Sequence, residues 1–140
     1  MLVRRLESFD EAVAAADIER RSLTTAWSAE QISSLPEYAL YLGAFDGELC
    51  GIASMYILAS EGQIMNLAVS AAHRRKGVAS LLMQSLIDEA VSRQGEVITL
   101  EVEDGNDSAI GLYTKYGFSV AGRRKGFYNG RDALIMEKTL

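Results

Sequence analysis

Cysteine, histidine, tryptophan and proline each occur only once in this chain of 140 residues. Because Cys50 is the single cysteine, no disulfide can form within the chain, and a reducing compartment is its natural environment. His73 has no second histidine or cysteine with which to share a metal ion, so we expect no metal site. No apolar run approaches the roughly 18 residues of a membrane-spanning helix. These absences favour an ordinary globular protein.

Positive charge is in the minority. The chain has 14 basic and 19 acidic residues and a net charge of −5, so we expect neither nucleic acid nor a membrane as a partner. Locally, basic residues gather at 74–76 and 123–125 and acidic ones at 101–104. A basic patch suits a polyanionic cofactor, and an acidic patch suits a cationic amine. The N-terminal segment is acidic where a signal peptide needs an apolar core, so we expect a cytoplasmic protein.

Apolar periodicity divides the chain into strands and helices. Strands are predicted at 2–6, 38–45, 49–58, 63–69, 97–102, 118–121 and 133–137. Helices are predicted to begin at Asp10, at Ser28 with Gln31 completing a capping box, after Gly77, and at Asn106 or Asp107. The apolar positions of the first helix include Val13, Ala14 and Ile18. Turns are predicted at Asp46-Gly47 and Glu61-Gly62, with a polar loop over 123–132.

The predicted order is β-α-α-β-β-β-α-β-α-β-β. A meander of antiparallel strands precedes a strand-helix-strand crossover, which predicts a mixed α/β sheet with helices on both faces. We find no repeat, linker or low-complexity tract, and Pro36 is the sole proline. Residues 1–140 are therefore expected to form a single domain.

The segment 73–80 (HRRKGVAS) joins an apolar strand to an amphipathic helix through a basic turn. Gly77 lets the backbone approach a ligand closely, and the first N–H groups of the helix point outward at an anion. The positive helix end and the cations at 74–76 favour a phosphate group there. Neither Gly-x-x-x-x-Gly-Lys-Ser/Thr nor Gly-x-Gly-x-x-Gly is present. The segment predicts a pyrophosphate site of another kind.

Two blocks carry a family resemblance. The pattern Arg-x-x-Gly-x-Ala at 74–79 resembles the Arg/Gln-x-x-Gly-x-Gly/Ala signature of the GNAT N-acetyltransferases. The segment 100–118 (LEVEDGNDSAIGLYTKYGF) resembles the "LEV…N…AI.LY..LGF" block of the same superfamily. Shorter pieces at 26–28, 65–69 and 123–136 extend the likeness over nearly the whole chain. Within the superfamily it is most similar to the ribosomal-protein alanine N-acetyltransferases of the RimI type.

This resemblance implies a GNAT-type fold with acetyl-CoA as co-substrate, the turn at Gly77 holding its pyrophosphate. The strand 67–69 is expected to splay from its neighbour and offer main-chain groups to pantetheine. The cofactor-binding residues that it implies are Leu67, Ala68, Val69, Arg74, Arg75, Lys76, Gly77, Val78, Ala79, Ser80 and Asn106.

The resemblance also implies two catalytic residues, Glu101 as the base for the amine and Tyr113 as the acid that protonates the departing thiolate. Each has a structural alternative, since Glu101 could be a solvated strand residue and Tyr113 a core aromatic. Asn106 could equally be only an N-cap. For the acceptor substrate the candidates are Trp27, Glu61 and Tyr128. Trp27 could instead be a core anchor, and Glu61 could be a solvated charge in a turn.

The implied reaction is direct transfer of an acetyl group from acetyl-CoA to a primary amine. RimI-type enzymes acetylate the N-terminal amine of ribosomal protein S18, which makes a protein N-terminus the first candidate acceptor. A small amine, such as a polyamine, amino sugar or amino acid, is the alternative. A non-catalytic acyl-CoA-binding domain is a third possibility, but such a module needs neither Glu101 nor Tyr113. We expect a monomer or a homodimer.

Overall fold

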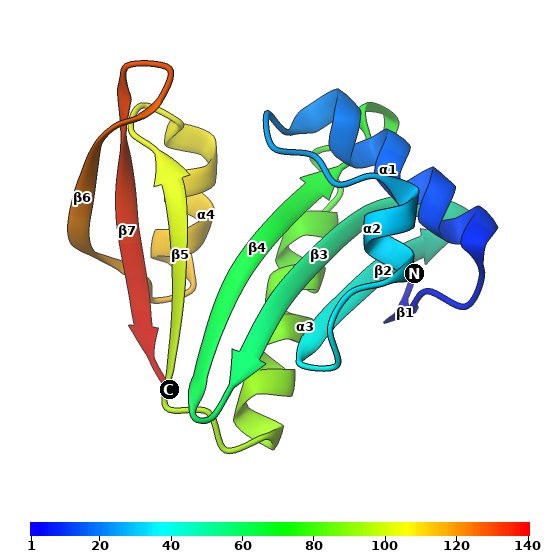
Figure 1. Ribbon diagram of the computed structural model, residues 1–140, viewed down its shortest axis with the longest axis horizontal. Helices are drawn as coiled ribbons and strands as arrows, with labels where there is room; N and C mark the ends of the chain where they lie inside the picture. The colour runs from blue at the N-terminus through cyan, green and yellow to red at the C-terminus, as the bar shows by residue number, and fades with distance from the viewer.

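A computed structural model describes residues 1–140, except for the side chain of Tyr128. In the described chain, seven strands form one sheet in the order β1-β2-β3-β4-β5-β7-β6 (Figure 1). The strands are β1 (Leu2–Arg5), β2 (Ala39–Asp46), β3 (Glu48–Leu58), β4 (Glu61–Val69), β5 (Val97–Glu103), β6 (Ser119–Tyr128) and β7 (Arg131–Thr139). The helices are α1 (Phe9–Ser22), α2 (Ala29–Ser33), α3 (Val78–Ser92) and α4 (Asp107–Lys115), with a 3-10 turn, η1 (Ala71–His73), before α3. None of the helices in the described residues is long and apolar enough to cross a membrane.

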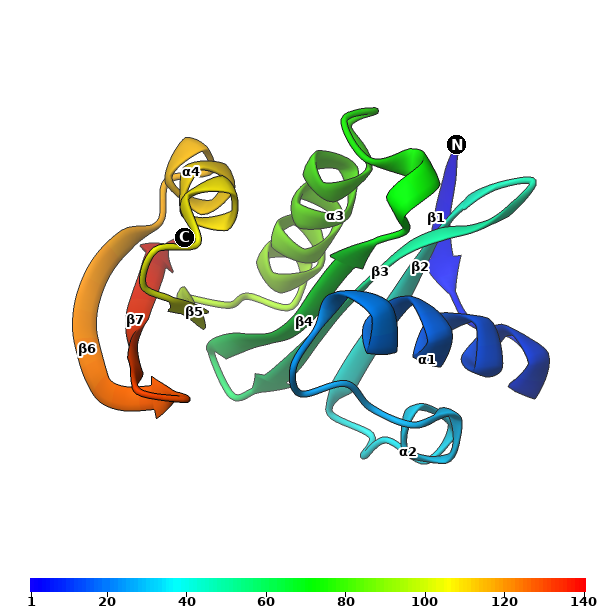
Figure 2. The same ribbon diagram turned by 90° about the horizontal axis from the view of Figure 1, so that it is seen from above.

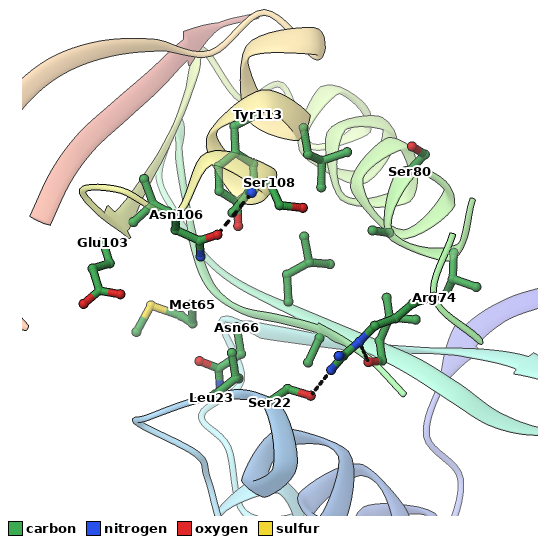
Figure 3. A pocket seen from close by; sticks show the side chains of 18 of the residues that line it. Ser22, Leu23, Met65, Asn66, Arg74, Ser80, Glu103, Asn106, Ser108 and Tyr113 are labelled. Atoms are coloured by element: carbon green, nitrogen blue, oxygen red, sulfur yellow. Dashed lines mark hydrogen bonds between the residues drawn. The ribbon is translucent and has the colours of Figure 1, made fainter. Parts of the chain in front are cut away.

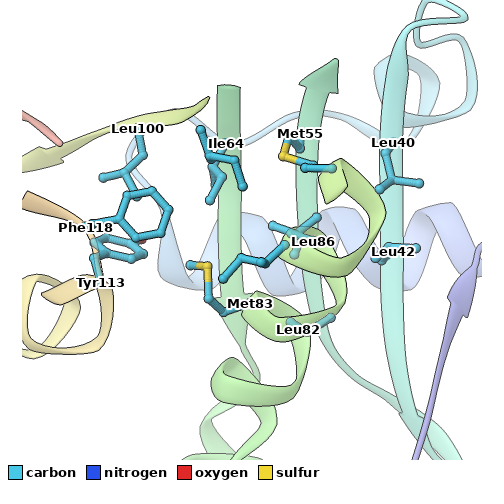
Figure 4. Close-up of a cluster of buried hydrophobic side chains, with 14 of the residues drawn as sticks. Leu40, Leu42, Met55, Ile64, Leu82, Met83, Leu86, Leu100, Tyr113 and Phe118 are labelled. Atoms are coloured by element: carbon cyan, nitrogen blue, oxygen red, sulfur yellow. The ribbon is translucent and has the colours of Figure 1, made fainter. Parts of the chain in front are cut away.

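Helices cover both faces of the sheet. Figure 2 shows α1 and α2 on one side, here called the α1 face, and α3 and α4 on the other, the α3 face. Adjacent residues of β3 are therefore buried on opposite faces: Ala53 belongs to the α3-face core, and Ile52 packs against α1. The α3-face core is the larger one, with Met55, Leu86 and Leu100 among its members (Figure 4). Each large side chain buried there stabilises the fold by about 1.5–3 kcal/mol.

The parallel strands β4 and β5 separate after a short ladder. Residues 61–63 pair with 97–99, and the pairing goes no further (Figure 1). A β-bulge at Met65 follows, and after it Asn66 resumes the pairing of β4 with β3. β5 instead pairs with β7 along its length. The C-terminal halves of β4 and β5 therefore diverge, and residues 67–69 keep a strand neighbour on one side only.

The predicted fold class is confirmed. The elements follow the predicted order, with an antiparallel meander, a β4-α3-β5 crossover and helices on both faces. Ser28 caps α2, and Gln31 completes the predicted capping box. Asn106 is the N-cap of α4, and Gly47, with φ +75°, forms the predicted hairpin turn between β2 and β3.

The predicted start of α1 is wrong, and of its three predicted apolar positions only Ile18 is buried. Ser8, rather than Asp10, is the N-cap, and its side chain accepts a hydrogen bond from the Glu11 N–H. Val13 and Ala14 are exposed, whereas the buried stripe consists of Ala12, Ala15, Ile18 and Glu19. The alanines of this stripe lie at helical spacing and let α1 pack closely on the sheet. The turn before β4 is also wrong, because Ala59 and Ser60 form it while Glu61 and Gly62 already pair with β3.

The predicted polar loop over 123–132 is mostly strand. β6 continues to Tyr128 and β7 begins at Arg131, which leaves Asn129-Gly130 as the turn, both with positive φ. Polar contacts hold this hairpin together, and its strands lack the alternating apolar residues by which a strand is predicted from sequence. The Asp132 carboxylate accepts from the Gly126 N–H at 3.1 Å and from Arg123 at 2.9 Å.

Candidate active site

A cleft of about 810 Å³ lies where β4 and β5 diverge (Figure 3). Its walls come from the end of α1 and the loop after it, the second half of β4, the basic turn with the start of α3, the end of β5 and the start of α4. These elements are far apart in sequence, and the mixed topology of the sheet brings them together.

The basic turn presents the N-terminus of α3 to this cleft. Gly77 is the N-cap residue with φ +81°, and none of the described side chains caps the helix. A Cβ at Gly77 would meet no heavy atom within 4 Å, so the glycine is needed for its backbone conformation. The first N–H groups of α3, at 78–80, therefore remain for an anion at the positive helix end. Arg74 and Arg75 line the same wall, whereas Lys76 lies off it.

Hydrogen bonds tie this wall to its neighbours. Arg74 donates from Nε to the carbonyl oxygen of Val69 at 3.2 Å and from Nη2 to Ser22 Oγ at 3.3 Å (Figure 3). The Tyr116 hydroxyl donates to the carbonyl oxygen of Ser80 at 3.1 Å. The turn is thus joined to α1 and β4 on one side, and the first turn of α3 is joined to α4 on the other.

Strand β4 offers main-chain groups to the cleft. Leu67, Ala68 and Val69 line it, and their pairing with β3 leaves the opposite edge of the strand without a neighbour. An open strand edge presents N–H and C=O groups that a ligand can use. The side chains of Leu67 and Val69 pack, partly buried, against the α3-face core.

Glu101 faces the cleft from the α1 face of the sheet. Its neighbours Leu100 and Val102 point into the α3-face core, so the alternation of the strand turns Glu101 the other way. Its Oε1 lies 2.7 Å from Nη2 of Arg124, which reaches over from β6. The Glu101 side chain is 22% exposed and that of Arg124 is 56% exposed, which places the ion pair at the rim.

Tyr113 and Asn106 border the cleft from α4 and its cap. Tyr113 is buried and packs edge-to-face on Phe118, with ring centroids 6.0 Å apart. It is therefore a core aromatic and a cleft residue at once. Asn106 Oδ1 accepts from the Ala109 N–H at 3.3 Å, and the same residue lines the cleft (Figure 3). Tyr113 and Glu101 thus flank the cleft from opposite faces of the sheet.

Two of the three residues predicted for the acceptor, Trp27 and Glu61, are not among the described residues that line the cleft. Trp27 is half-buried and stacks on Tyr56, with ring centroids 6.1 Å apart, which is the anchoring role. Glu61 is exposed at the start of β4, the end opposite the cleft. Tyr128 ends β6, and its side chain lies outside the described part of the chain.

Sequence reasoning missed a buried carboxylate behind the cleft. Glu19 is fully buried, and its oxygens accept hydrogen bonds from the Trp27 N–H at 2.9 Å, from Asn66 Nδ2 at 2.8 Å and from the Tyr41 hydroxyl. Burial raises the pKa of Glu19, and burial together with the nearby carboxylate raises the pKa of Tyr41. Glu19 lies seven residues after Ala12, a helical spacing that could have placed it on the buried stripe.

Comparisons with known proteins agree with this geometry. Residues 6–118 match the acetyltransferase (GNAT) family model. A relative from Bacillus subtilis (strain 168) is 34% identical over 97% of this chain and 92% of its own length. The ribosomal protein bS18-alanine N-acetyltransferase of Escherichia coli (strain K12) is 33% identical over 88% of this chain and 87% of its own.

Solved structures agree as well. The crystal structure of the ribosomal-protein-S18-alanine N-acetyltransferase from Escherichia coli has a TM-score of 0.88 at 30% identity, covering 99% of this chain and 92% of that one. An aminoglycoside 6′-N-acetyltransferase complexed with coenzyme A shares the fold, with a TM-score of 0.83 at 18% identity and 99% and 97% coverage. The chain therefore belongs to the acetyltransferase (GNAT) family and is an acetyl-CoA-dependent N-acetyltransferase.

Proposed function

We propose that this enzyme transfers the acetyl group directly to the N-terminal α-amine of a protein, with the N-terminal alanine of ribosomal protein S18 as the first candidate. The observation that carries the proposal is the extent of the likeness. The Escherichia coli enzyme named for this acceptor is 33% identical over 88% of the chain, whereas the aminoglycoside enzyme, whose fold covers 99% of the chain, is 18% identical. A ribosomal acceptor is consistent with the expected cytoplasmic location.

The cleft fits acetyl-CoA at two places. The pyrophosphate would lie against the open N-terminus of α3, where Arg74, Arg75 and the N–H groups at 78–80 supply positive charge, with Lys76 nearby. The pantetheine arm carries amides, which suit the unpaired edge of β4 at 67–69 and the side chain of Asn106.

Two side chains would move the protons. Acetyl-CoA supplies the acetyl group as a thioester. Glu101 takes a proton from the α-ammonium group, whose pKa is about 8, directly or through a water molecule. Tyr113 donates its phenolic proton to the departing thiolate. Because these side chains line the cleft from different elements, β5 and α4, the two proton transfers would take place at separate walls of the cleft.

Cys50 supports direct transfer without a covalent enzyme intermediate. The thiol is fully buried and donates to the carbonyl oxygen of Ala44 at 3.2 Å. Burial raises the pKa of Cys50, which opposes formation of a nucleophilic thiolate. The residue also lies outside the cleft lining.

The acceptor is tested by measuring free-thiol release from acetyl-CoA. A peptide with the S18 N-terminus is compared with polyamines, amino sugars and amino acids. The matched control is the same peptide with its α-amine already acetylated, which retains every side chain but cannot react there. Turnover of the free peptide alone supports the proposal. Selective turnover of a small amine would contradict the acceptor while leaving the family assignment intact.

A further inference from the structure

Glu19 fixes the orientation of the Asn66 side chain. One oxygen of Glu19, Oε1, accepts both the Trp27 backbone N–H at 2.9 Å and Asn66 Nδ2 at 2.8 Å. An ionised carboxylate has no hydrogen to donate, so this oxygen accepts from both the Trp27 N–H and the Asn66 NH₂ group. The Asn66 amide must therefore turn its NH₂ group toward Glu19 and its oxygen, Oδ1, away from it.

The oxygen of Asn66 is open to the cleft. Among the described residues, every buried side-chain nitrogen and oxygen has a hydrogen-bond partner. Within that same part of the chain, Asn66 uses its side chain only to donate to Glu19, and nothing donates to Oδ1. That oxygen is thus reachable, and the cavity that Asn66 lines is the cleft (Figure 3). Since a carbonyl oxygen only accepts hydrogen bonds, its ligand is a donor.

Asn66 and Glu101 lie on the same face of the sheet. The Asn66 side chain reaches α1, and Glu101 points to this α1 face from the neighbouring strand. Tyr113 borders the cleft from α4 on the other face. A donor that enters from the α1 face therefore meets Glu101 and Asn66 together, across the cleft from Tyr113.

We propose that Asn66 Oδ1 accepts a hydrogen bond from the acceptor amine, and that Glu19 is the positioning residue that holds the Asn66 amide. This inference rests on the proposed amine acetylation in the same cleft. Asn66 directly precedes 67–69, the edge assigned to pantetheine, so its side chain lies near the end of that arm. As the ammonium group gives one proton to Glu101, a remaining N–H bonds to Asn66, which aims the nitrogen lone pair at the acetyl carbon.

Steady-state kinetics and calorimetry test the contact. Asn66→Ala is expected to lower kcat/KM for the acceptor about 10- to 100-fold, as for loss of a hydrogen bond to a charged group, with the Kd for acetyl-CoA changed by less than about twofold. An equal loss of acetyl-CoA affinity would overturn the proposal, because Oδ1 would then serve a pantetheine amide. Unchanged kinetics would overturn it as well.

Variants of Glu19 test the positioning role. Glu19→Ala is expected to reproduce the loss of Asn66→Ala, and the double variant to lose no more than either alone. Glu19→Gln should restore most of the activity, because its oxygen can still accept from Trp27 and Asn66 while its NH₂ donates to the Tyr41 oxygen. Losses that simply add, or no rescue by glutamine, would contradict the coupling.

Tyr41→Phe is the matched control for stability. It removes the hydrogen bond to the other oxygen of Glu19, Oε2, but leaves Asn66 held, so Tm should fall while kcat/KM stays near the wild-type value. If Glu19→Ala does not fold, the proposal is still tested by comparing kcat/KM of Asn66→Ala, which should fall, with that of Tyr41→Phe, which should not. Failure of the proposed acceptor can be told apart from failure of the Asn66 contact. In the first case the wild-type enzyme would prefer a small amine, and kcat/KM of each variant relative to the wild type would then be measured with that amine. Wild-type inactivity toward every amine would overturn both.

Discussion

Arg124 Nη2 lies 2.7 Å from Glu101 Oε1, so an ion pair joins β6 to β5 across β7 at the rim of the cleft. A partly exposed pair of this kind adds only about 0–1 kcal/mol to stability. Its consequence is geometric, because a guanidinium group on one carboxylate oxygen fixes the direction of the other. The ion pair therefore bears on whether Glu101 can face an incoming amine.

Glu101→Gln tests the proposed base. The amide keeps the shape of the side chain but cannot take a proton, so kcat is expected to fall about 100-fold or more while the Kd for acetyl-CoA stays unchanged. Steady-state initial rates of free-thiol release give kcat, and isothermal titration calorimetry gives the Kd for acetyl-CoA. Retention of full kcat would remove Glu101 from the mechanism.

Arg124→Ala tests the orientation of that base. The free energy of unfolding should change by less than about 1 kcal/mol, while kcat falls because the carboxylate is no longer held. Arg124→Lys is the matched control, since it keeps the charge but lacks the planar fork of donors, and an intermediate kcat is expected. A loss of stability without a change in kcat would make the pair purely structural.

Tyr113→Phe removes only a hydroxyl group from a buried ring. Packing on Phe118 should survive, so acetyl-CoA affinity is expected to change little while kcat falls about 100-fold through loss of the acid. Tyr116→Phe at the C-cap of α4 is the control, because the Tyr116 hydroxyl donates to the Ser80 carbonyl oxygen and its loss should cost about 1 kcal/mol of stability. If both variants behave alike, Tyr113 is a packing residue.

Gly77→Asp should weaken acetyl-CoA binding roughly tenfold, by placing a negative charge where the phosphates would lie. Gly77→Asn separates charge from conformation, because asparagine has the same shape and tolerates the left-handed backbone at φ +81°. The affinity gap between these variants should shrink at high salt. Equal Kd values for the two would mean that the turn does not face a phosphate group.

The fold was largely predictable, because apolar periodicity or a capping motif marks at least part of every strand and helix, and Gly77 marks the turn of the crossover. The position of the basic turn before α3 was predictable from local sequence for the same reason. The acceptor side of the cleft was not predictable from local sequence, because contacts between elements far apart in the chain orient its side chains. Asn66 reaches Glu19 from 47 positions away, and Arg124 meets Glu101 across a third strand. In the polar hairpin after Arg123, Asn129-Gly130 is a local turn signal, but the contact of Arg123 with Asp132 that holds the two strands forms between residues nine positions apart.

Two carboxylates of α1 predict opposite dependences of stability on pH. Hydrogen bonds from Arg4, and from the Glu7 N–H, lower the pKa of Glu11 to about 2. Because the folded pKa lies below the unfolded value of 4.5, Glu11 stabilises the fold above that value and the contribution is lost as the pH falls toward 2. Burial raises the pKa of Glu19, so the folded state binds the extra proton and stability rises as the pH falls from the folded pKa toward 4.5.

Thermal unfolding of Glu11→Gln and Glu19→Gln across this pH range measures both effects. The Tm advantage of the wild-type protein over Glu11→Gln should shrink as the pH is lowered, because a protonated Glu11 no longer attracts Arg4. The difference from Glu19→Gln should move the other way, in favour of the wild type, because the cost of burying a charge disappears on protonation. Parallel curves for the two variants would show that Glu19 carries no buried charge at neutral pH.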